Sequence, residues 1–226
     1  RKVSALRTFY KYLTVKSNLL ENNPVKELEI PSLKKSLPKY LSLNESVTLL
    51  ENVSSSNKIR DFCILTLFLN CGMRLSELVG INLEDIKDNT LKLLGKGNKE
   101  RIIYLNEQCI NTIEEYSKIR PKDTKEKNAL FISKKGARLS KRRVQEIVTY
   151  NLEANGLNGY STHKLRHTAA TLLYQYGNVD INILKELLGH ENLGTTQIYT
   201  HISNKQLEDA SLKSPLKSVK SPKNQK

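Results

Sequence analysis

The hydrophobic positions of the chain recur at helical spacing along most of its length. Residues 58–70, KIRDFCILTLFLN, are apolar almost all round beyond Asp61, which predicts a buried helix. A second helix with an inward apolar stripe is expected to start at the capping residue Ser140 and to end at Gly156. Further helices are predicted over residues 42–52, 106–119, 163–176, 180–188 and 204–212, with a short one around Tyr199. Residues 71–81 are predicted to make a turn and then another helix.

Alternating apolar and polar positions are confined to the middle of the chain. Residues 90–105, TLKLLGKGNKERIIYL, form two such runs around a glycine-containing turn, which predicts a β-hairpin. A third short strand is predicted over residues 128–133, NALFIS. The expected fold class is therefore mainly α with a small antiparallel β-sheet, an α+β arrangement.

The chain is expected to divide near residue 38. An apolar face from Val3 to Leu13 predicts a first helix, and because no capping residue precedes it, the chain is expected to begin inside a longer element. Residues 31–41, PSLKKSLPKYL, carry two prolines and three lysines without periodicity and are typical of a linker. Residues 214–226 are rich in lysine and offer little to bury, which predicts a disordered basic tail.

Charge narrows the choice of partner. The 226 residues carry 37 basic and 23 acidic side chains, a formal net charge of +14, and 38% of them are hydrophobic, enough for a packed core. The excess of basic side chains predicts a polyanionic partner, and nucleic acid is favoured over a membrane surface. Charge alone also fits a basic protein without such a partner. No apolar stretch approaches the roughly 18 residues of a membrane span, so no membrane partner is expected.

The cysteines indicate a reducing setting. Cys63, Cys71 and Cys109 show neither a disulfide framework nor C-x-x-C spacing, so structural zinc is not expected. Cys63 lies inside an apolar run and is interpreted as a small core residue. This usage fits a cytoplasmic location.

Six side chains could together act on a phosphate. They are two guanidiniums, an ammonium, two imidazoles and a phenol: Arg74, Arg166, Lys96, His163, His190 and Tyr199. Arginine forks match phosphate oxygens, and preorganised donors of this kind suit the charge of a pentacoordinate phosphorus. Histidine and lysine can move protons, and a tyrosine hydroxyl can act as the nucleophile. No metal and no other cofactor is needed for this chemistry.

Each of these residues taken alone also fits a structural role. Arg74 could pair with Glu77 one turn further on, His163 could cap its helix, and Tyr199 could simply pack. His163 and His167 have the i, i+4 spacing of metal ligands, but no HExxH motif and no matching carboxylate accompany them. A catalytic interpretation therefore requires the six side chains to converge in space.

Four segments of the chain resemble, in order and spacing, the motifs of the tyrosine recombinases, or phage integrase family. They are CGMRLSEL at 71–78, LLGKGNKERIIYL at 93–105, STHKLRHTAATLL at 161–173 and LLGHENLGTTQIYTHIS at 187–203. Their style is that of bacterial Xer recombinases and related phage or transposon integrases. The resemblance covers residues 37–212. It implies a tyrosine-recombinase catalytic domain over 40–213, a linker over 33–39 and, at 1–32, the end of a helical, SAM-like core-binding domain.

The resemblance also assigns roles to the phosphate-handling residues. Arg74 and Arg166 match the two arginines that clamp the scissile phosphate. Lys96 matches the hairpin lysine that protonates the leaving 5′-oxygen. His163 matches the histidine that shuttles the proton of the tyrosine, and His190 matches a residue that hydrogen-bonds the phosphate.

The remaining motif position is the nucleophile. Tyr199 matches the tyrosine that attacks a DNA phosphodiester to give a 3′-phosphotyrosine and a free 5′-hydroxyl. The bond energy is kept in this link, so rejoining needs neither ATP nor a metal. Glu77 and His167 match supporting positions, the former orienting Arg74.

A basic cluster is the candidate DNA contact. Lys141, Arg142 and Arg143 occupy the first turn of a predicted helix, where cations oppose the helix dipole, so another reason for their presence is expected. Contact with DNA phosphates or base edges would explain the three cations, and a solvated basic face is the alternative interpretation. Lys99 and Arg101 flank the hairpin turn and are grouped with them.

Two further expectations concern assembly and activity. The last predicted helix presents Leu207, Ala210 and Leu212. The resemblance implies that this helix docks on a neighbouring copy, giving a dimer to tetramer on double-stranded DNA with a specific recombination site, whereas the alternative is packing on its own domain. Site-specific recombination, for chromosome dimer resolution or a mobile element, is the expected function. Type IB topoisomerase activity and a non-catalytic DNA-binding regulator are the alternatives.

Overall fold

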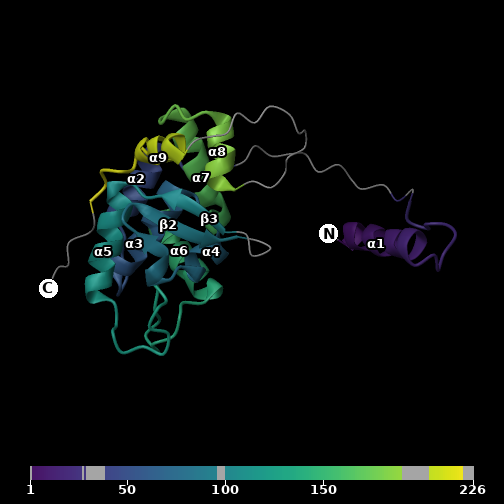
Figure 1. The fold of residues 1–226 in the computed structure, drawn as a ribbon, viewed down its shortest axis with the longest axis horizontal. Helices are drawn as coiled ribbons and strands as arrows, with labels where there is room; N and C mark the ends of the chain where they lie inside the picture. Colours follow the sequence, from purple (N-terminus) through teal and green to yellow (C-terminus); the bar gives the residue numbers. More distant parts are fainter. Residues whose placement is uncertain (1, 27, 29–38, 96–99, 190–203, 221–226) are drawn as a thin grey trace. The chain divides into compact units, whose positions relative to one another are not determined.

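The chain forms two compact units. The computed structural model describes residues 2–26, 28, 39–95, 100–189 and 204–220 (Figure 1). One unit is Arg1–Pro38 and the other is Lys39–Lys226. The division falls inside the segment that the prolines and lysines predict to be a linker.

The first unit is a single helical stretch followed by a turn. It consists of α1 (Lys2–Lys11), which continues into a π-helical turn at Tyr12–Lys16. None of the α1 residues is buried, and Phe9 on its apolar face is 54% exposed. Within the described parts of the chain, no helix has the combination of length and apolar character that crossing a membrane requires.

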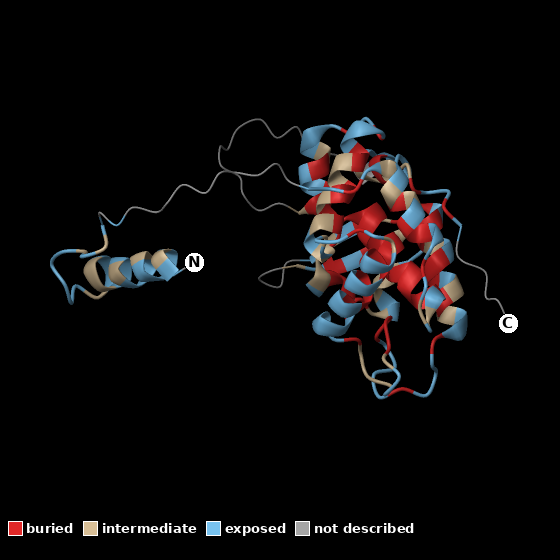
Figure 2. Ribbon diagram, turned by 180° about the vertical axis from the view of Figure 1, so that it is seen from behind, coloured by how far each residue is buried: buried red, intermediate tan, exposed pale blue. Residues whose placement is uncertain are grey.

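The second unit is built around one central helix, α3 (Lys58–Cys71). All its side chains from Ile59 to Cys71 are buried, as the continuous apolar run predicts. The view coloured by burial shows the buried positions gathered in the middle of this unit (Figure 2). Four helices pack against α3: α2 (Leu43–Glu51), α5 (Glu107–Ile119), α6 (Lys141–Ala154) and α7 (Thr162–Gln175).

Capping side chains set where these helices begin. The Ser42 hydroxyl accepts the Glu45 backbone N–H at 3.2 Å, and the Glu45 carboxylate accepts the Ser42 N–H at 2.7 Å. Asn106, Ser140 and Asp180 accept backbone N–H groups at the starts of α5, α6 and α8 (Ile181–Leu188). Each cap contributes about 1 kcal/mol, and all four positions agree with the sequence.

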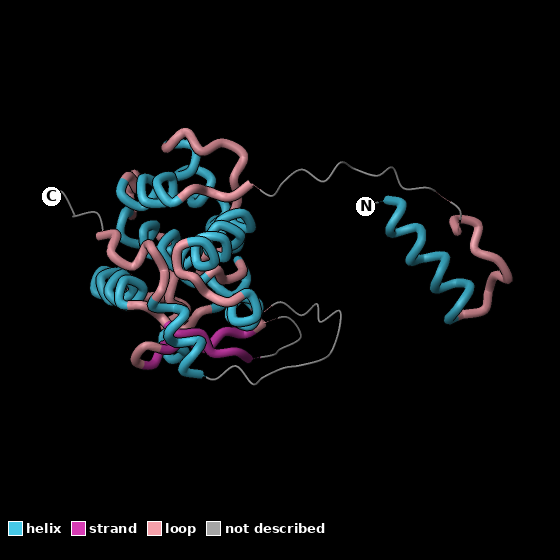
Figure 3. Tube along the Cα trace, turned by 90° about the horizontal axis from the view of Figure 1, so that it is seen from above, coloured by secondary structure: helices cyan, strands magenta, loops and turns pink. Residues whose placement is uncertain are grey.

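A small sheet lies at one edge of the helical body (Figure 3). Its strands are β1 (Ile86–Lys87), β2 (Thr90–Leu94) and β3 (Glu100–Tyr104), antiparallel in the order β1-β2-β3. Leu93 pairs with Arg101, so the two side chains share a face. The β2–β3 pair is the predicted hairpin.

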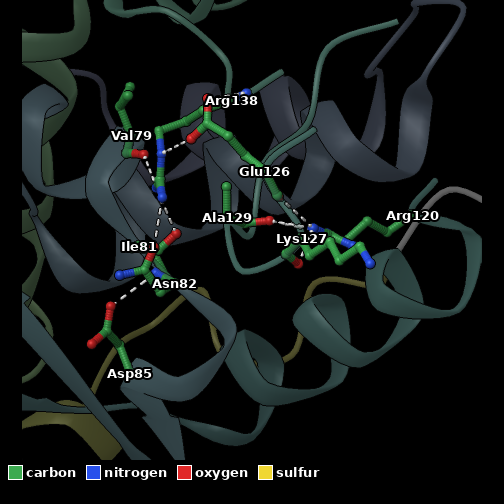
Figure 4. Close-up of polar contacts among 9 residues, drawn as sticks. All are labelled: Val79, Ile81, Asn82, Asp85, Arg120, Glu126, Lys127, Ala129 and Arg138. Atoms are coloured by element: carbon green, nitrogen blue, oxygen red, sulfur yellow. Dashed lines mark hydrogen bonds and ion pairs between the residues drawn. The ribbon is translucent and has the colours of Figure 1, made fainter. Parts of the chain in front are cut away.

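The third strand predicted over residues 128–133 is not formed, and β1 takes its place. Residues 129–132 are buried in an unbroken run and make only isolated bridges, Asn82↔Ala129 and Ile132↔Arg138. The Leu130 N–H donates to the Ile81 carbonyl, and two arginine side chains bind further carbonyls of this region (Figure 4). Arg120 donates to the Ala129 carbonyl, and Arg138 donates to the Val79 and Ile81 carbonyls.

Two further helices of this unit are described in addition to α8, whereas the short helix predicted around Tyr199 lies outside the described residues. They are α4 (Leu75–Gly80), which contacts α6 and β2, and α9 (Asn204–Leu212), which contacts α8 and β3. On α9, Ala210 is buried and Leu207 is partly buried against the cluster of α8 leucines, whereas Leu212 is 46% exposed. Two of the three apolar residues predicted to face a neighbouring copy therefore pack on their own domain.

The C-terminal segment corrects the prediction of a disordered tail. Leu216 is fully buried in the main core and Val219 is 8% exposed. The Ser214 hydroxyl hydrogen-bonds the Asn70 side-chain oxygen of α3 at 2.5 Å. Two apolar side chains three residues apart are thus enough to fix Ser214 to Lys220, and residues 221–226 lie outside the described part of the chain.

Leu216→Ala is expected to lower the free energy of unfolding by about 3 kcal/mol, because it empties a fully buried position. Urea denaturation followed by circular dichroism measures this change. Ser218→Ala, at an exposed position of the same segment, is the control and is expected to change little. A Leu216→Ala protein as stable as the control would show that the tail does not pack in solution.

Candidate active site

A tight turn places the first candidate residue. Gly72 ends α3 in the left-handed region, with φ of +56°, and the chain turns at once into α4, whose N-cap is Arg74. A Cβ on Gly72 would lie 2.6 Å from Leu188 Cδ2. The positive φ favours glycine at this position, and a larger residue would also have to displace the Leu188 side chain.

Glu77 holds Arg74 in place from one turn further along α4. Its carboxylate accepts the Arg74 backbone N–H at 2.6 Å and Arg74 Nη1 at 2.8 Å. The Glu77 residue is 2% exposed, whereas the Arg74 side chain is 36% exposed. The pair thus anchors a guanidinium whose remaining surface still reaches solvent.

Arg101 of β3 joins the same carboxylate. Its Nη2 donates to Glu77 Oε2 at 3.0 Å, and its Nη1 donates to the Leu187 carbonyl. The sequence grouped Arg101 with the DNA contacts beside the hairpin turn, but its side chain is only 18% exposed and lies on the inner face of the strand beside Leu93. Strand alternation explains this difference, because Leu93 is core and its cross-strand partner faces the same way.

Arg166 of α7 is the most deeply placed arginine of the group, at 6% exposed. Its Nη1 donates to the Gly72 carbonyl and its Nη2 to the Leu188 carbonyl, both at 2.6 Å. His163, one turn earlier on the same helix, is exposed. His167 packs edge-on against the Tyr40 ring, with 6.1 Å between ring centroids.

The C-terminal end of α8 collects all three guanidiniums. Arg101, Arg166 and Arg74 donate to three successive carbonyls, those of Leu187, Leu188 and Gly189. The end of a helix carries partial negative charge, which favours cations at this position. The arrangement holds three arginines side by side at the point where the segment of His190 and Tyr199 begins in the sequence.

The group has an excess of positive charge. Among the described residues, the hydrogen bonds and ion pairs of these three arginines include one carboxylate, Glu77. Burial, and then the neighbouring Arg74 and Arg101, lower the pKa of Arg166 to about 10, so it stays cationic at neutral pH. Burial alone would raise the pKa of Glu77, but Arg101 and the hydrogen bonds from both arginines outweigh burial and lower it. This cluster can bind and stabilise a phosphate whose negative charge increases during a reaction.

The other predicted residues are placed apart or lie outside the described ranges. Lys141, Arg142 and Arg143 form the exposed first turn of α6, where the two arginines pair with Glu146. The residues outside the described ranges are Lys96, Lys99, His190 and Tyr199. The described residues thus bring together Arg74, Arg166, Glu77 and Arg101, which the sequence predicted as a DNA contact and whose signal for this inward position is its place opposite Leu93.

The described residues contain no group of three or more histidine, cysteine, aspartate or glutamate side chains arranged to hold a metal ion. His163 and His167 in particular have different surroundings, one exposed and the other packed on Tyr40.

Glu77→Gln is expected to lower the free energy of unfolding at pH 7 by about 3 kcal/mol, because it leaves two arginines short of their shared carboxylate. The folded-state pKa of Glu77 is lowered, so its ionised form stabilises the fold above the unfolded pKa of about 4.3 and this contribution is lost as pH falls through the folded pKa. Urea denaturation between pH 7 and pH 3 should therefore show the gap to wild type narrowing below about pH 4. A gap that stays constant would contradict the charge pairing.

The fold and the arginine cluster together define a class of protein. A mainly helical body with a small antiparallel sheet is the arrangement of a tyrosine-recombinase catalytic domain, and the arginine cluster lies within this body. Residues 39–206 match the Phage integrase family, and the chain belongs to this family. The membership predicted from the four sequence motifs is confirmed.

Known relatives are similar in sequence and in structure. Tyrosine recombinase XerC of Caldanaerobacter subterraneus subsp. tengcongensis is 55% identical over 219 residues, which are 96% of this chain and 62% of that protein. The chain therefore spans less than two thirds of the length of this relative. The crystal structure of XerA recombinase matches 92% of this chain and 81% of its own, with a TM-score of 0.63 and 25% identity. A pre-cleavage complex of XerH site-specific recombinase bound to difH substrate matches 84% of this chain and 58% of its own, with a TM-score of 0.61 and 28% identity.

Proposed function

We propose that the chain is the catalytic part of a site-specific DNA recombinase that cleaves and rejoins DNA through Tyr199. The observation that carries this proposal is the convergence of Arg74 and Arg166, which are 92 residues apart in the sequence, on one partly buried cluster with excess positive charge. A phosphodiester supplies the missing negative charge. XerH, a structural relative, binds its difH substrate in a pre-cleavage complex.

The proposed reaction is a phosphoryl transfer without an external energy source. The Tyr199 hydroxyl attacks the scissile phosphorus, a bond forms between the tyrosine oxygen and the 3′-phosphate, and the bond to the 5′-oxygen breaks. His163 takes the proton of the phenol and Lys96 gives a proton to the leaving 5′-oxygen. Rejoining is the same sequence in reverse, with a 5′-hydroxyl as the nucleophile.

The arginine cluster contributes by electrostatic preorganisation. The guanidiniums of Arg74 and Arg166 are already fixed, by Glu77 in one case and by two backbone carbonyls in the other. Little reorganisation is needed when charge builds up on the phosphate oxygens, and such donors are effective in a site of low dielectric. His190 would add a further donor to the phosphate, and His167 supports α7 through its contact with Tyr40.

DNA contacts outside the cluster are proposed at the start of α6. Lys141, Arg142 and Arg143 are exposed, and the Arg142 side chain is 89% exposed. The pairing of both arginines with Glu146 is at the surface and therefore weak, so DNA phosphates can replace it. We also propose Lys99 as a contact from the hairpin.

The arrangement of the complete assembly follows as part of the same proposal. Residues 1–32 end a core-binding domain, residues 33–39 link it to the catalytic domain over 40–213, and copies assemble as a dimer to tetramer on double-stranded DNA. The contact that α9 offers a neighbour is its exposed side around Leu212. A recombinase of chromosomal or mobile DNA acts in the bacterial cytoplasm, which is the proposed location.

A nicked suicide duplex tests this function. A pool of randomised duplexes is first selected for binding to the chain, and the bound sequences are then prepared with a nick that lets the cleaved 5′-strand diffuse away. A protein–DNA adduct that survives denaturing electrophoresis, in buffer containing a chelator, is the expected result. Absence of any adduct on bound duplexes would favour the non-catalytic regulator.

The same preparation separates recombination from relaxation. A plasmid carrying two copies of the selected site should give recombined products, whereas a type IB topoisomerase would relax supercoiled plasmid irrespective of the site. Relaxation without recombined products would overturn the recombinase assignment while leaving the tyrosine chemistry in place.

A further inference from the structure

Arg101 has contacts that neither a DNA-binding residue nor an ordinary surface arginine requires. We propose that Arg101 is a positioning residue for the cleavage reaction, which fixes the Arg74–Glu77 pair and the end of α8 relative to each other. The inference rests on the proposed function, since it concerns the same phosphate site. The inference gives β3 a role in positioning the catalytic residues, and this role differs from the one proposed for Lys96.

Three contacts of Arg101 support this role. Its guanidinium bridges two elements, with Nη2 on Glu77 Oε2 of α4 and Nη1 on the Leu187 carbonyl of α8. Its side chain also lies along Gly189, because a Cβ added there would be 3.3 Å from both Arg101 Cδ and Arg101 Nε. With φ of +64°, Gly189 is suited to glycine on both grounds. Arg101 therefore occupies the space between the α4 carboxylate and the last turn of α8.

The sharing of Glu77 between two arginines changes the charge of the site. Glu77 Oε2 accepts both the Arg74 backbone N–H at 2.6 Å and Arg101 Nη2 at 3.0 Å, while Oε1 accepts Arg74 Nη1. A carboxylate paired with Arg74 alone would act only on the charge of the arginine that it orients. Glu77 is shared with Arg101, so it orients Arg74 while offsetting less of the charge on that guanidinium.

The bridge to α8 has a second consequence. Arg74 and Arg166 also donate to the end of α8, at the Gly189 and Leu188 carbonyls, and both guanidiniums have further N–H groups that can bind a phosphate. Arg101 is held on both sides, by Glu77 and by Leu187, and it is the less exposed of the two arginines on Glu77. It can therefore hold the end of α8 against α4 while the other two arginines bind the phosphate.

Arg138 supplies a matched control. It is also an arginine that joins a carboxylate, Glu126, to backbone carbonyls at the end of a helix, those of Val79 and Ile81 (Figure 4). Its side chain is 24% exposed, close to the 18% of Arg101, and its contacts lie outside the arginine cluster. Val79 and Ile81 lie at the end of α4 opposite to Arg74, so loss of Arg138 should cost stability while the bonds of the arginine cluster stay in place.

The test compares Arg101→Gln, Arg101→Lys, Glu77→Gln and the Arg101→Gln/Glu77→Gln double variant with Arg138→Gln. Single-turnover cleavage of the suicide duplex, DNA affinity at several salt concentrations and the thermal midpoint are measured for each. Arg101→Gln is expected to slow cleavage about 100-fold, the size of effect that small misplacements of reacting groups produce, with DNA affinity and its salt dependence nearly unchanged. The double variant should cleave no more slowly than Glu77→Gln, because both residues act through the same carboxylate.

The remaining variants make the outcome decisive. Arg101→Lys should slow cleavage about tenfold, because one ammonium cannot span Glu77 and Leu187, and it serves in place of Arg101→Gln if that protein does not fold. Arg138→Gln should lower the thermal midpoint and leave the cleavage rate of the folded protein unchanged. Cleavage at the wild-type rate in both Arg101 variants would overturn the inference. So would a double variant whose loss of rate equals the product of the losses in Arg101→Gln and Glu77→Gln. If Arg101→Gln reduces the slope of log DNA affinity against log salt concentration by about one, Arg101 contacts a DNA phosphate instead. Failure of the wild-type chain to form any adduct would count against the proposed function.

Discussion

Tyr199→Phe is expected to eliminate the covalent protein–DNA adduct on the suicide duplex, with cleavage falling by a factor on the order of 10⁴ to 10⁶. The change removes one oxygen atom, and that oxygen is the atom that bonds to phosphorus in the proposed reaction. Tyr176→Phe is the control, because Tyr176 is an exposed tyrosine at the end of α7, at 57% exposed. Denaturing electrophoresis of labelled duplex after reaction measures both.

DNA binding by the Tyr199→Phe variant distinguishes loss of the nucleophile from loss of folding. The described arginine cluster holds its geometry through Glu77 and the carbonyls of Leu187, Leu188 and Gly189, none of which involves the Tyr199 hydroxyl. Tyr199→Phe should therefore bind the same duplex with nearly wild-type affinity. An adduct of normal yield in this variant would mean that another nucleophile attacks the phosphate, and the proposed mechanism would be wrong.

The parts of the fold that sequence predicted well are those set by local chemistry. The burial of α3 follows from a run of apolar residues, and the starts of α2, α5, α6 and α8 follow from Ser42, Asn106, Ser140 and Asp180, whose side chains accept backbone N–H groups within their own first turns. The hairpin follows from alternation around glycines. Each of these signals lies within a few residues of the structure that it specifies.

The predictions that failed concern structure that is set by residues distant in the sequence. Leu216 is buried in a core formed mostly by elements far away in the chain, and residues 129–132 are held by the Arg120 side chain and by backbone bonds such as that from Leu130 N–H to the Ile81 carbonyl. The core around Leu216 and the backbone partner of Leu130 are distant in the sequence, so no local pattern predicts either contact. Composition predicted a solvated tail because lysines dominate it, but burial depends on single apolar side chains.

In the candidate site, too, local sequence predicted some features, whereas contacts between distant residues could not be predicted. Motif resemblance identified Arg74 and Arg166, because their residue types and spacing are specific, but it gave no contact for either. The three successive carbonyls at the end of α8 became visible only in the structure, since every residue has a carbonyl and sequence does not say which are free. The inward direction of Arg101 depends on the pairing of its strand with Leu93.

Arg166→Lys is expected to slow cleavage about 1,000-fold while the protein still folds, because catalysis depends on the shape of this cation as well as on its charge. Arg166 donates two separate bonds at 2.6 Å, to the Gly72 carbonyl and the Leu188 carbonyl, and a guanidinium that makes both still has N–H groups left for a phosphate. A lysine ammonium is a point charge that cannot link the end of α3 to the end of α8 and also fork onto a phosphate.

Arg142→Lys on the exposed turn of α6 is the matched control, because a surface phosphate contact tolerates an exchange of one cation for another. Both variants keep the net charge, so nonspecific attraction to DNA is unchanged and any difference reflects geometry. Single-turnover cleavage, normalised to the folded fraction from circular dichroism, measures the two. Equal rates for Arg166→Lys and Arg142→Lys would show that the buried cation contributes only charge, and the arginine cluster would then not be the phosphate clamp on which the recombinase proposal depends.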